Sequence, residues 1–150
     1  MVTIELQIDR NAVYNEVAKT TSYTGQKMVD DSGAYDRIFT TDADQEMLAR
    51  FWDECRAEIT QRLVGIVASE GMTEEDIYTL ALNVSSAFDK ALQPSMYLSL
   101  FSYFVQSLTA KWFLFTNKGE ADKSELRAKA SLEDVREKAY YKKKPMRPTY

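Results

Sequence analysis

SMYLSLFSYFVQSLTAKWFLFTNKG, residues 95–119, is the most apolar stretch of this 150-residue chain. Its large side chains recur at helical spacing but occupy more than one face of the predicted helix. A helix that is apolar on nearly all sides is central to a fold, or presents its second side to a neighbouring subunit. We expect four aromatic residues of this stretch and one from the residues upstream to form the core and a subunit contact: Phe101, Phe104, Trp112 and Phe115, with Trp52.

Polar residues recur through the same stretch, among them Ser99, Gln106 and Lys111, and make it too polar to cross a membrane. Gly119 is expected to end the helix. A last and more polar helix is predicted over residues 121–140. Its thin apolar stripe consists of Leu126, Leu132, Val135 and Ala139.

Upstream, the residues after Thr41 predict a long helix over 42–69. Thr41 is a suitable N-cap, and acidic residues follow it in the first turn. Gly71 is the expected C-terminal stop. Apolar residues between them recur every three or four positions and form one stripe: Leu48, Trp52, Cys55, Ile59, Leu63 and Ile66.

A second helix is expected to follow over residues 73–92. Thr73 stands before three acidic residues, an arrangement typical of a capped helix start. Pro94 either ends this helix or begins the next one as its first residue. The apolar residues between them continue at helical spacing: Ile77, Leu80, Ala81, Val84, Phe88, Ala91 and Leu92.

The N-terminal residues have the period of a strand. Apolar side chains alternate with polar ones over 2–8, and the apolar set is Val2, Ile4, Leu6 and Ile8. One strand is not stable alone, so this one must pair with another segment, for which the extended C-terminus and a neighbouring chain are two options. Asp9 can cap a short helix after it.

Together these elements predict a mainly α fold: a bundle of about four to five helices with a long helix at 42–69, a short extended N-terminal strand and an extended C-terminal arm. We divide the chain into an N-terminal strand or arm with a short helix (1–40), a helical core domain (41–137) and a basic extended arm (138–150).

The side chains that most enzymes use are sparse. The chain has no histidine, and its few glycines are too far apart to form a phosphate-binding loop. Its one cysteine, Cys55, lies on the apolar stripe with Trp52 and Ile59, which favours a buried structural thiol. The acidic residues at 42–46 lack the glycine and terminal glutamate of a calcium loop. We therefore predict a protein that is not an enzyme and holds no cofactor or metal.

The charge is unevenly distributed. Residues 136–150 contain six basic residues and one acidic residue, a net charge of +5, so the other 135 residues carry −9 of the total of −4. An acidic body with a basic end suits head-to-tail contact between identical subunits.

The C-terminal KAYYKKKPMRPTY, residues 138–150, adds tyrosine and proline to this positive charge. Tyrosine and arginine are enriched where protein surfaces meet, and proline holds a chain extended. A nucleic-acid arm and a solvated tail are the alternatives, although the acidic body would repel a duplex lying across it. We interpret these residues as an interaction arm: Tyr140, Tyr141, Lys142, Lys143, Lys144, Pro145, Arg147 and Pro148.

The order of these elements resembles the head–tail connector (adaptor) proteins of tailed bacteriophages. The resemblance covers about residues 42–148, and is carried by DADQEMLARFWDECRAEITQRL, MYLSLFSYFVQSLTAKWFLFTNKGEADKS and AYYKKKPMRP. The N-terminal 40 residues depart from the simplest form of that family.

This resemblance implies a non-enzymatic virion protein of the phage neck, made in the host cytoplasm. Proteins of the family form rings, often of twelve copies, that extend the DNA channel beneath the portal. For this chain it implies a homo-oligomeric ring, with the portal protein and a tail or stopper protein as partners. DNA would pass nearby without specific binding, and no membrane is involved. The strand at 2–8 and the basic end would be arms that reach neighbours.

Two other functions stay open at this point. A phage tail-completion or terminator protein is one, and it would be expected to contain more strand. A small helical DNA-binding or regulatory protein is the other. It would use its basic C-terminus and bind a duplex in a salt-dependent way.

Overall fold

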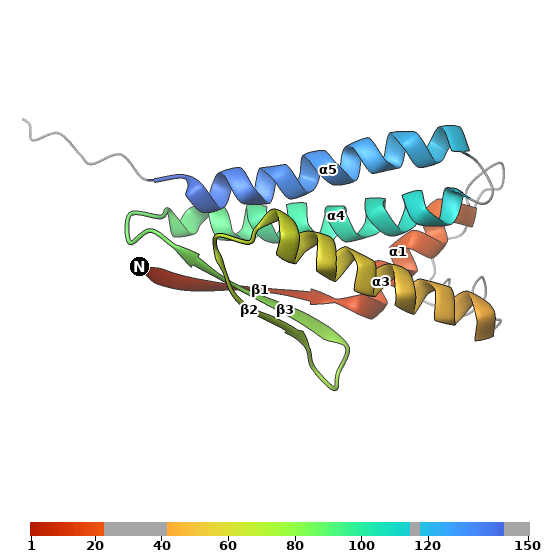
Figure 1. The fold of residues 1–150 in the computed structure, drawn as a ribbon, viewed down its shortest axis with the longest axis horizontal. Coiled ribbons are helices and arrows are strands. Elements are labelled where there is room, and N and C mark those ends of the chain that lie inside the picture. The colour runs from red at the N-terminus through yellow and green to blue at the C-terminus, as the bar shows by residue number, and fades with distance from the viewer. Residues whose placement is uncertain (23–41, 115–117, 143–150) are drawn as a thin grey trace, which may run out of the picture.

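The computed structural model describes residues 1–22, 42–114 and 118–142 (Figure 1). This part of the chain is mostly helical, with four α-helices and a small three-stranded antiparallel sheet. The mainly α prediction is confirmed at that level, but the fold is not a pure helical bundle. The elements in chain order are β1 (Val2–Asp9), α1 (Arg10–Ser22), α3 (Asp42–Arg62), β2 (Val67–Met72), β3 (Ile77–Val84), a 3₁₀ turn (Lys90–Leu92), α4 (Gln93–Phe113) and α5 (Lys118–Tyr140).

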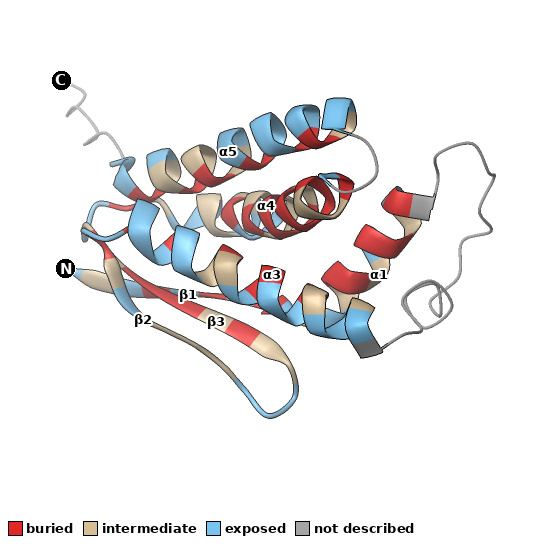
Figure 2. Cartoon of the chain, turned by 45° about the vertical axis from the view of Figure 1, so that its right-hand side comes forward, coloured by how far each residue is buried: buried red, intermediate tan, exposed pale blue. Residues whose placement is uncertain are grey.

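Helix α4 lies at the centre of the molecule, and most of its surface is covered (Figure 2). Helix α5 packs along one side of it, while α1, α3 and β1 contact it elsewhere. Met96, Leu100, Phe104 and Leu108 have no exposed surface. The residues of α4 are apolar on several sides because several elements of the same chain pack against it. The predicted core role of this helix is confirmed.

A cluster of four buried aromatic side chains joins the helices to the sheet. The ring of Trp52 in α3 stacks on Phe104 in α4, with centroids 4.1 Å apart and planes at 15°. Tyr78 of β3 meets Phe104 edge-on at 5.2 Å, and Tyr14 of α1 meets Trp52 edge-on at 5.9 Å. Both geometries are favourable for aromatic pairs. The cluster therefore ties α1, α3, α4 and β3 together.

The sheet has the order β1-β3-β2, with both outer strands antiparallel to β3. On the face toward the helices, Ile4, Leu6 and Ile8 of β1 are buried and lie beside Leu82, Leu80 and Tyr78 of β3. The strand predicted at 2–8 is confirmed. Its partner is β3 of the same chain, whereas the sequence suggested the C-terminus or a neighbouring chain.

The helix predicted over 73–92 is wrong, because residues 77–84 form the central strand β3. The large buried side chains alternate as Tyr78, Leu80, Leu82 and Val84. Ile77 and Ala81 lie on the other face of the sheet. When they are counted with Leu80 and Val84, the apolar residues recur at three- and four-residue intervals, which is the spacing of a helix. Thr73 caps a turn instead of a helix, since its Oγ1 accepts hydrogen bonds from the backbone N–H groups of Glu75 and Ile77 at 3.2 Å.

The helix predicted over 42–69 is also too long. Helix α3 ends at Arg62, and Val67–Met72 forms β2, so Gly71 lies inside a strand and does not stop a helix. Leu63 and Ile66 remain buried as the stripe predicted. The chain leaves the helix after Arg62 because β2 pairs with β3, and this pairing partner lies outside any local sequence window.

Helix α5 faces α4 with mostly small residues: Ala121, Ser124, Ala128, Leu132, Val135 and Ala139. Small side chains let two helices approach closely along their length. The predicted stripe is correct for Leu132, Val135 and Ala139. It is wrong for Leu126, which is 69% exposed because the buried positions around it are Ser124 and Ala128.

Two leucines of α5 provide a matched test of this packing. We expect Leu132→Ala to lower the free energy of unfolding by about 2–5 kcal/mol, since it removes a buried side chain and leaves a cavity. Leu126→Ala should change it by no more than about 0.5 kcal/mol, because that side chain is exposed. Urea denaturation followed by circular dichroism measures both. Equal losses for the two variants would contradict the orientation of α5.

Candidate interaction surface at the C-terminal end of α5

Polar contacts with α4 fix the C-terminal half of α5. Asp134 Oδ2 accepts hydrogen bonds from Ser99 Oγ and from Lys138 Nζ, both at 2.6 Å. Burial works to raise the pKa of Asp134, but hydrogen bonds from Lys138 and Ser99 outweigh it and hold this pKa below its ordinary value. Lys138 also donates to Ser95. These contacts determine where the chain leaves the domain.

Tyr140, in the last turn of α5, lies against the connection between α3 and β2. A Cβ atom added to Gly65 would come within 3.4 Å of the Tyr140 hydroxyl oxygen. The Arg136 guanidinium lies 5.4 Å from the centroid of the Tyr140 ring, a cation–π distance. Arg136 also pairs with Glu133 at 3.3 Å, and Glu133 pairs with Arg62 of α3. Tyr140 is thus held from two elements.

Large side chains with apolar surface are exposed near the C-terminal end of α5. Tyr140 and Tyr141 are 53% and 50% exposed, and Val64, next to Gly65, is 77% exposed. An open cavity of about 560 Å³ lies against Arg136, Tyr140 and Tyr141. We call Val64, Arg136, Tyr140 and Tyr141 the C-terminal patch. Exposed tyrosine beside arginine is typical of surfaces that bind another protein.

The structure describes part of the predicted interaction arm. Helix α5 continues through Tyr140, so the extended segment begins later than residue 138, because Lys138 and Ala139 still contact α4. Tyr141 and Lys142 follow the helix and are exposed. The other residues of the predicted arm lie outside the described residues: Lys143, Lys144, Pro145, Arg147 and Pro148.

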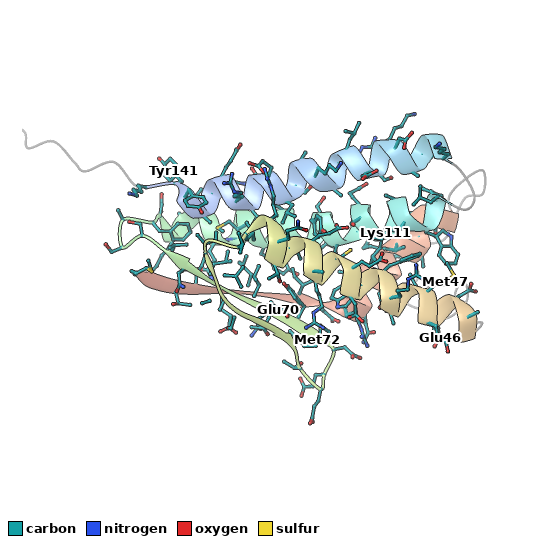
Figure 3. All side chains as sticks on the ribbon, viewed as in Figure 1. Glu46, Met47, Glu70, Met72, Lys111 and Tyr141 are labelled. Carbon is teal, nitrogen blue, oxygen red and sulfur yellow. The ribbon has the colours of Figure 1, made fainter. Side chains whose placement is uncertain are left out.

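Acidic side chains lie both beside this patch and far from it. Glu137 lines the same open cavity as Tyr140 and Tyr141. Tyr141 lies at one end of the long axis of the molecule, and Glu46, in the first half of α3, lies at the other (Figure 3). The turn between β2 and β3 carries the exposed Glu74 and Glu75, and it also points away from the C-terminal end of α5 (Figure 1). Exposed acidic side chains are therefore present far from Tyr141 as well as near it.

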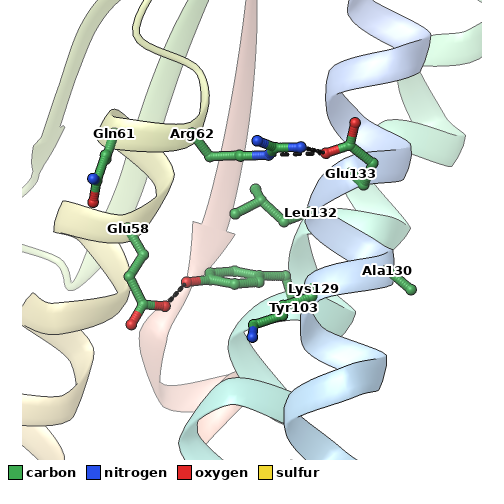
Figure 4. Close-up of a pocket in the computed structure, with 8 residues that line it drawn as sticks. All are labelled: Glu58, Gln61, Arg62, Tyr103, Lys129, Ala130, Leu132 and Glu133. Carbon is green, nitrogen blue, oxygen red and sulfur yellow. Dashed lines mark hydrogen bonds and ion pairs between the residues drawn. The ribbon is translucent and has the colours of Figure 1, made fainter.

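A cavity of about 740 Å³ lies between α3 and α5 (Figure 4). The Tyr103 hydroxyl donates to Glu58 at 2.6 Å inside it, and Arg62 and Glu133 pair across it. Lys129 in its wall pairs with Glu125 at 3.5 Å. The charged groups of this cavity are already paired, so a charged ligand would have to displace these partners.

The other residues singled out from the sequence have separate places. Ile4, Leu6 and Ile8 are buried in β1, and Val2 is partly buried. Trp52 and Phe104 stack in the core. Phe101 and Trp112 are half-buried and pack against the core from outside, and Phe115 lies outside the described residues. None of those that the structure describes lines the cavity beside Tyr140 and Tyr141.

Cys55 is buried between α3 and α4, as the sequence predicted. Its Sγ lies 3.3 Å from Ser107 Oγ. Burial raises the pKa of the Cys55 thiol to about 12, although the hydrogen bond with Ser107 acts in the opposite direction. The thiol is therefore protonated at neutral pH, and a protonated, covered sulfur is a poor nucleophile.

Residues 1–22, 42–114 and 118–142 contain neither a cluster of metal-ligating side chains nor a helix that could span a membrane. There, no group of three or more His, Cys, Asp or Glu side chains is placed to hold a metal ion. Among the helices of these same ranges, none is both long and apolar enough to cross a membrane.

Comparison with known family models, curated proteins and solved structures finds no match for this chain. The candidate surface is therefore supported by the geometry of this chain alone. The sequence did not predict that Val64, Gly65 and the Arg62–Glu133 pair contribute to this part of the surface. The pair joins residues 71 positions apart, and no local pattern signals such a contact.

The state of Cys55 can be measured directly. We expect the native thiol to react with a disulfide reagent such as DTNB at pH 8 at least about a hundred times more slowly than an exposed thiol, because the raised pKa and burial both suppress thiolate attack. Ser69→Cys, at an exposed position in β2, provides the comparison. Unfolding in guanidinium should release full reactivity of Cys55. Rapid modification of native Cys55 would contradict the buried geometry.

Proposed function

We propose that this chain is a non-enzymatic structural protein of a phage virion, a head–tail connector-like subunit. It assembles with copies of itself into a ring that joins the portal to the tail or stopper. The observation that carries this proposal is the uneven charge along the chain, with +5 in residues 136–150 and −9 in the other 135 residues.

Two different, complementary surfaces on one chain make a head-to-tail contact between copies. Such a contact generates a ring when the rotation between neighbours closes, and an open filament when it does not. Here the C-terminal patch supplies aromatic and arginine contacts, and Lys142 adds positive charge. Exposed acidic side chains on the next copy supply the opposite charge, either Glu46 of α3 or Glu74 and Glu75 of the β2–β3 turn. Opposite charge speeds association and fixes its register.

The charge of the rest of the chain fits the same role. Outside residues 136–150 the net charge is −9. A ring whose lumen is lined by acidic side chains repels the phosphate backbone, so DNA slides through without adhering. Portal and tail or stopper proteins would then bind the two faces of the ring.

One observation favours the alternative function, a tail-completion or terminator protein. That function leads us to expect more strand, and β2 and β3 occupy residues for which the sequence predicted helix. The two functions differ in the partner that the ring binds. A connector binds the portal, whereas a tail-completion protein binds the end of the tail tube.

Removal of the C-terminal end tests the assembly. We expect the full chain to form rings, alone or with purified portal protein, and a chain that stops at Ala139 to remain folded but fail to assemble. Light scattering after size-exclusion chromatography and negative-stain imaging measure assembly, and circular dichroism measures folding. Rings that form equally well without residues 140–150, or a full chain that never forms rings with portal or with tail tube, would overturn the proposal.

Charge and sequence can be separated with two matched variants at Lys142, Lys143 and Lys144. Changing all three to Glu should abolish assembly, whereas changing all three to Arg should preserve it, because only the sign of the charge matters for this contact. The same proteins address the DNA-binding alternative by fluorescence anisotropy with a DNA duplex at low salt. Tight, salt-dependent binding that the Glu variant loses would favour DNA binding over ring assembly.

A further inference from the structure

The outer edge of β1 has no partner strand among the described residues. Strand β3 is central, so β1 and β2 each leave one edge unpaired in the described sheet. Natural edge strands avoid unwanted pairing by being short or by carrying bulges, proline or lysine. Strand β2 is short, contains Gly71 and has a register irregularity between Val67 and Ser69. Strand β1 has eight residues in regular register and contains no proline, glycine or lysine.

The backbone groups at this edge can be identified. The Asn83 N–H of β3 donates to the Ile66 carbonyl on the β2 side at 2.7 Å, so odd-numbered residues of β3 face β2. The backbone N–H and C=O groups of successive residues in a strand point to opposite edges. The even-numbered residues of β3 therefore form their backbone hydrogen bonds with even-numbered residues of β1. Thr3, Glu5 and Gln7 then face outward. Gln93 Nε2 donates to the Glu5 carbonyl at 3.0 Å, in agreement with this assignment.

Exposed apolar side chains of α4 lie beside the same edge. An open groove of about 400 Å³ runs between β1 and the N-terminus of α4, and its lining includes Glu5, Gln7, Pro94 and Tyr97. The ring of Tyr97 lies 6.3 Å from that of the half-buried Phe101, and the neighbouring Leu98 is 65% exposed. An added strand would displace the Gln93 side chain from the Glu5 carbonyl, and would gain backbone hydrogen bonds from β1 and apolar contact with Tyr97 of α4.

We propose that the occupant of this edge is β1 of a second copy, paired antiparallel about a twofold axis at Leu6. The two sheets then become continuous, and the α4 helices of both copies come together above the junction through Tyr97 and Leu98. Isologous pairing of this kind buries the same surface on each chain.

The sequence of β1 is complementary to itself in this register. Leu6 lies opposite Leu6, Ile4 opposite Ile8, Glu5 opposite Gln7, and Thr3 opposite Asp9 of the second copy. Apolar residues therefore pair with apolar residues, and no carboxylate faces another. A shift of the axis to Glu5 would place two glutamates directly opposite, which is destabilising. This complementarity favours a second copy over an unrelated strand.

This dimer goes beyond the ring proposed above and uses a different surface. The ring contact depends on the C-terminal patch and the basic end, whereas the dimer depends on β1 and the N-terminal half of α4. A chain that stops at Ala139 should lose the ring and keep the dimer. The two proposals can therefore fail separately.

Gln7→Pro tests the dimer, with Gln7→Val as the matched control. The Gln7 N–H faces outward, so proline removes a donor of the intermolecular ladder and leaves the bonds to β3 in place. Valine keeps the donor and favours a strand. Using the 1–139 chain as well as the full chain, we expect Gln7→Pro to weaken dimerisation about tenfold or more in sedimentation velocity, and Gln7→Val to leave it unchanged.

Two further measurements distinguish loss of the dimer contact from misfolding of the Gln7→Pro variant. Leu98→Asp, an exposed change on α4, should also dissociate the dimer without lowering the thermal midpoint of the monomer. Hydrogen exchange in the native dimer should protect the Thr3, Glu5 and Gln7 amides, and these amides should exchange freely in Leu98→Asp. A native chain that is monomeric at micromolar concentration would overturn the proposal. So would a dimer that neither Gln7→Pro nor Leu98→Asp weakens.

Discussion

The stack of Trp52 on Phe104 is the contact on which the arrangement of the other elements depends. It presses α3 against α4, and Tyr78 and Tyr14 meet the stacked pair edge-on from β3 and α1. The indole N–H of Trp52 also donates to the Met72 sulfur of β2 at 3.3 Å. One buried pair of rings thus fixes elements that are far apart in the sequence. Aromatic pairs have preferred geometries, so they determine orientation as well as distance.

This packing determines which parts of the molecule are exposed and free to contact a partner. With α3 and α4 covering one face of the sheet, β1 is left at one edge with its odd-numbered backbone groups directed outward. With α5 bound along α4, the Tyr140 end of the chain is held against the α3–β2 connection (Figure 1). The C-terminal patch and the β1 edge are separate consequences of one packing arrangement. They can therefore serve separate contacts.

Polar contacts at the margin of the core support the same arrangement. Between α3 and α4, the Tyr103 hydroxyl donates to Glu58, and Lys111 pairs with Glu58 at 3.1 Å. The turn between β2 and β3 is tied to α1 by the Arg10–Asp76 pair at 2.6 Å. Of these groups only the Tyr103 side chain is buried, so removal of Glu58 would leave the Tyr103 hydroxyl without its partner, which is costly. These contacts hold the relative positions of the helices and the sheet, and so the positions of both candidate surfaces.

The sequence by itself determined the elements whose pattern is local. The alternation of Val2, Ile4, Leu6 and Ile8, the Asp9 cap that accepts from the Asn11 N–H, and the apolar helix around Phe104 were all readable, because each signal lies within a few residues. The basic, tyrosine-containing end was readable for the same reason. Its charge does not depend on the fold.

Only the tertiary structure decided the rest. Residues 77–84 carry a pattern compatible with a helix or a strand, and pairing with β1 and β2 on both sides selected the strand. The exposure of Leu126 was decided by which face of α5 meets α4, and small residues mark that face only weakly in a sequence. The position of Tyr140 against Gly65 joins residues that are distant in the sequence. Such contacts arise from packing between elements, which no local pattern encodes.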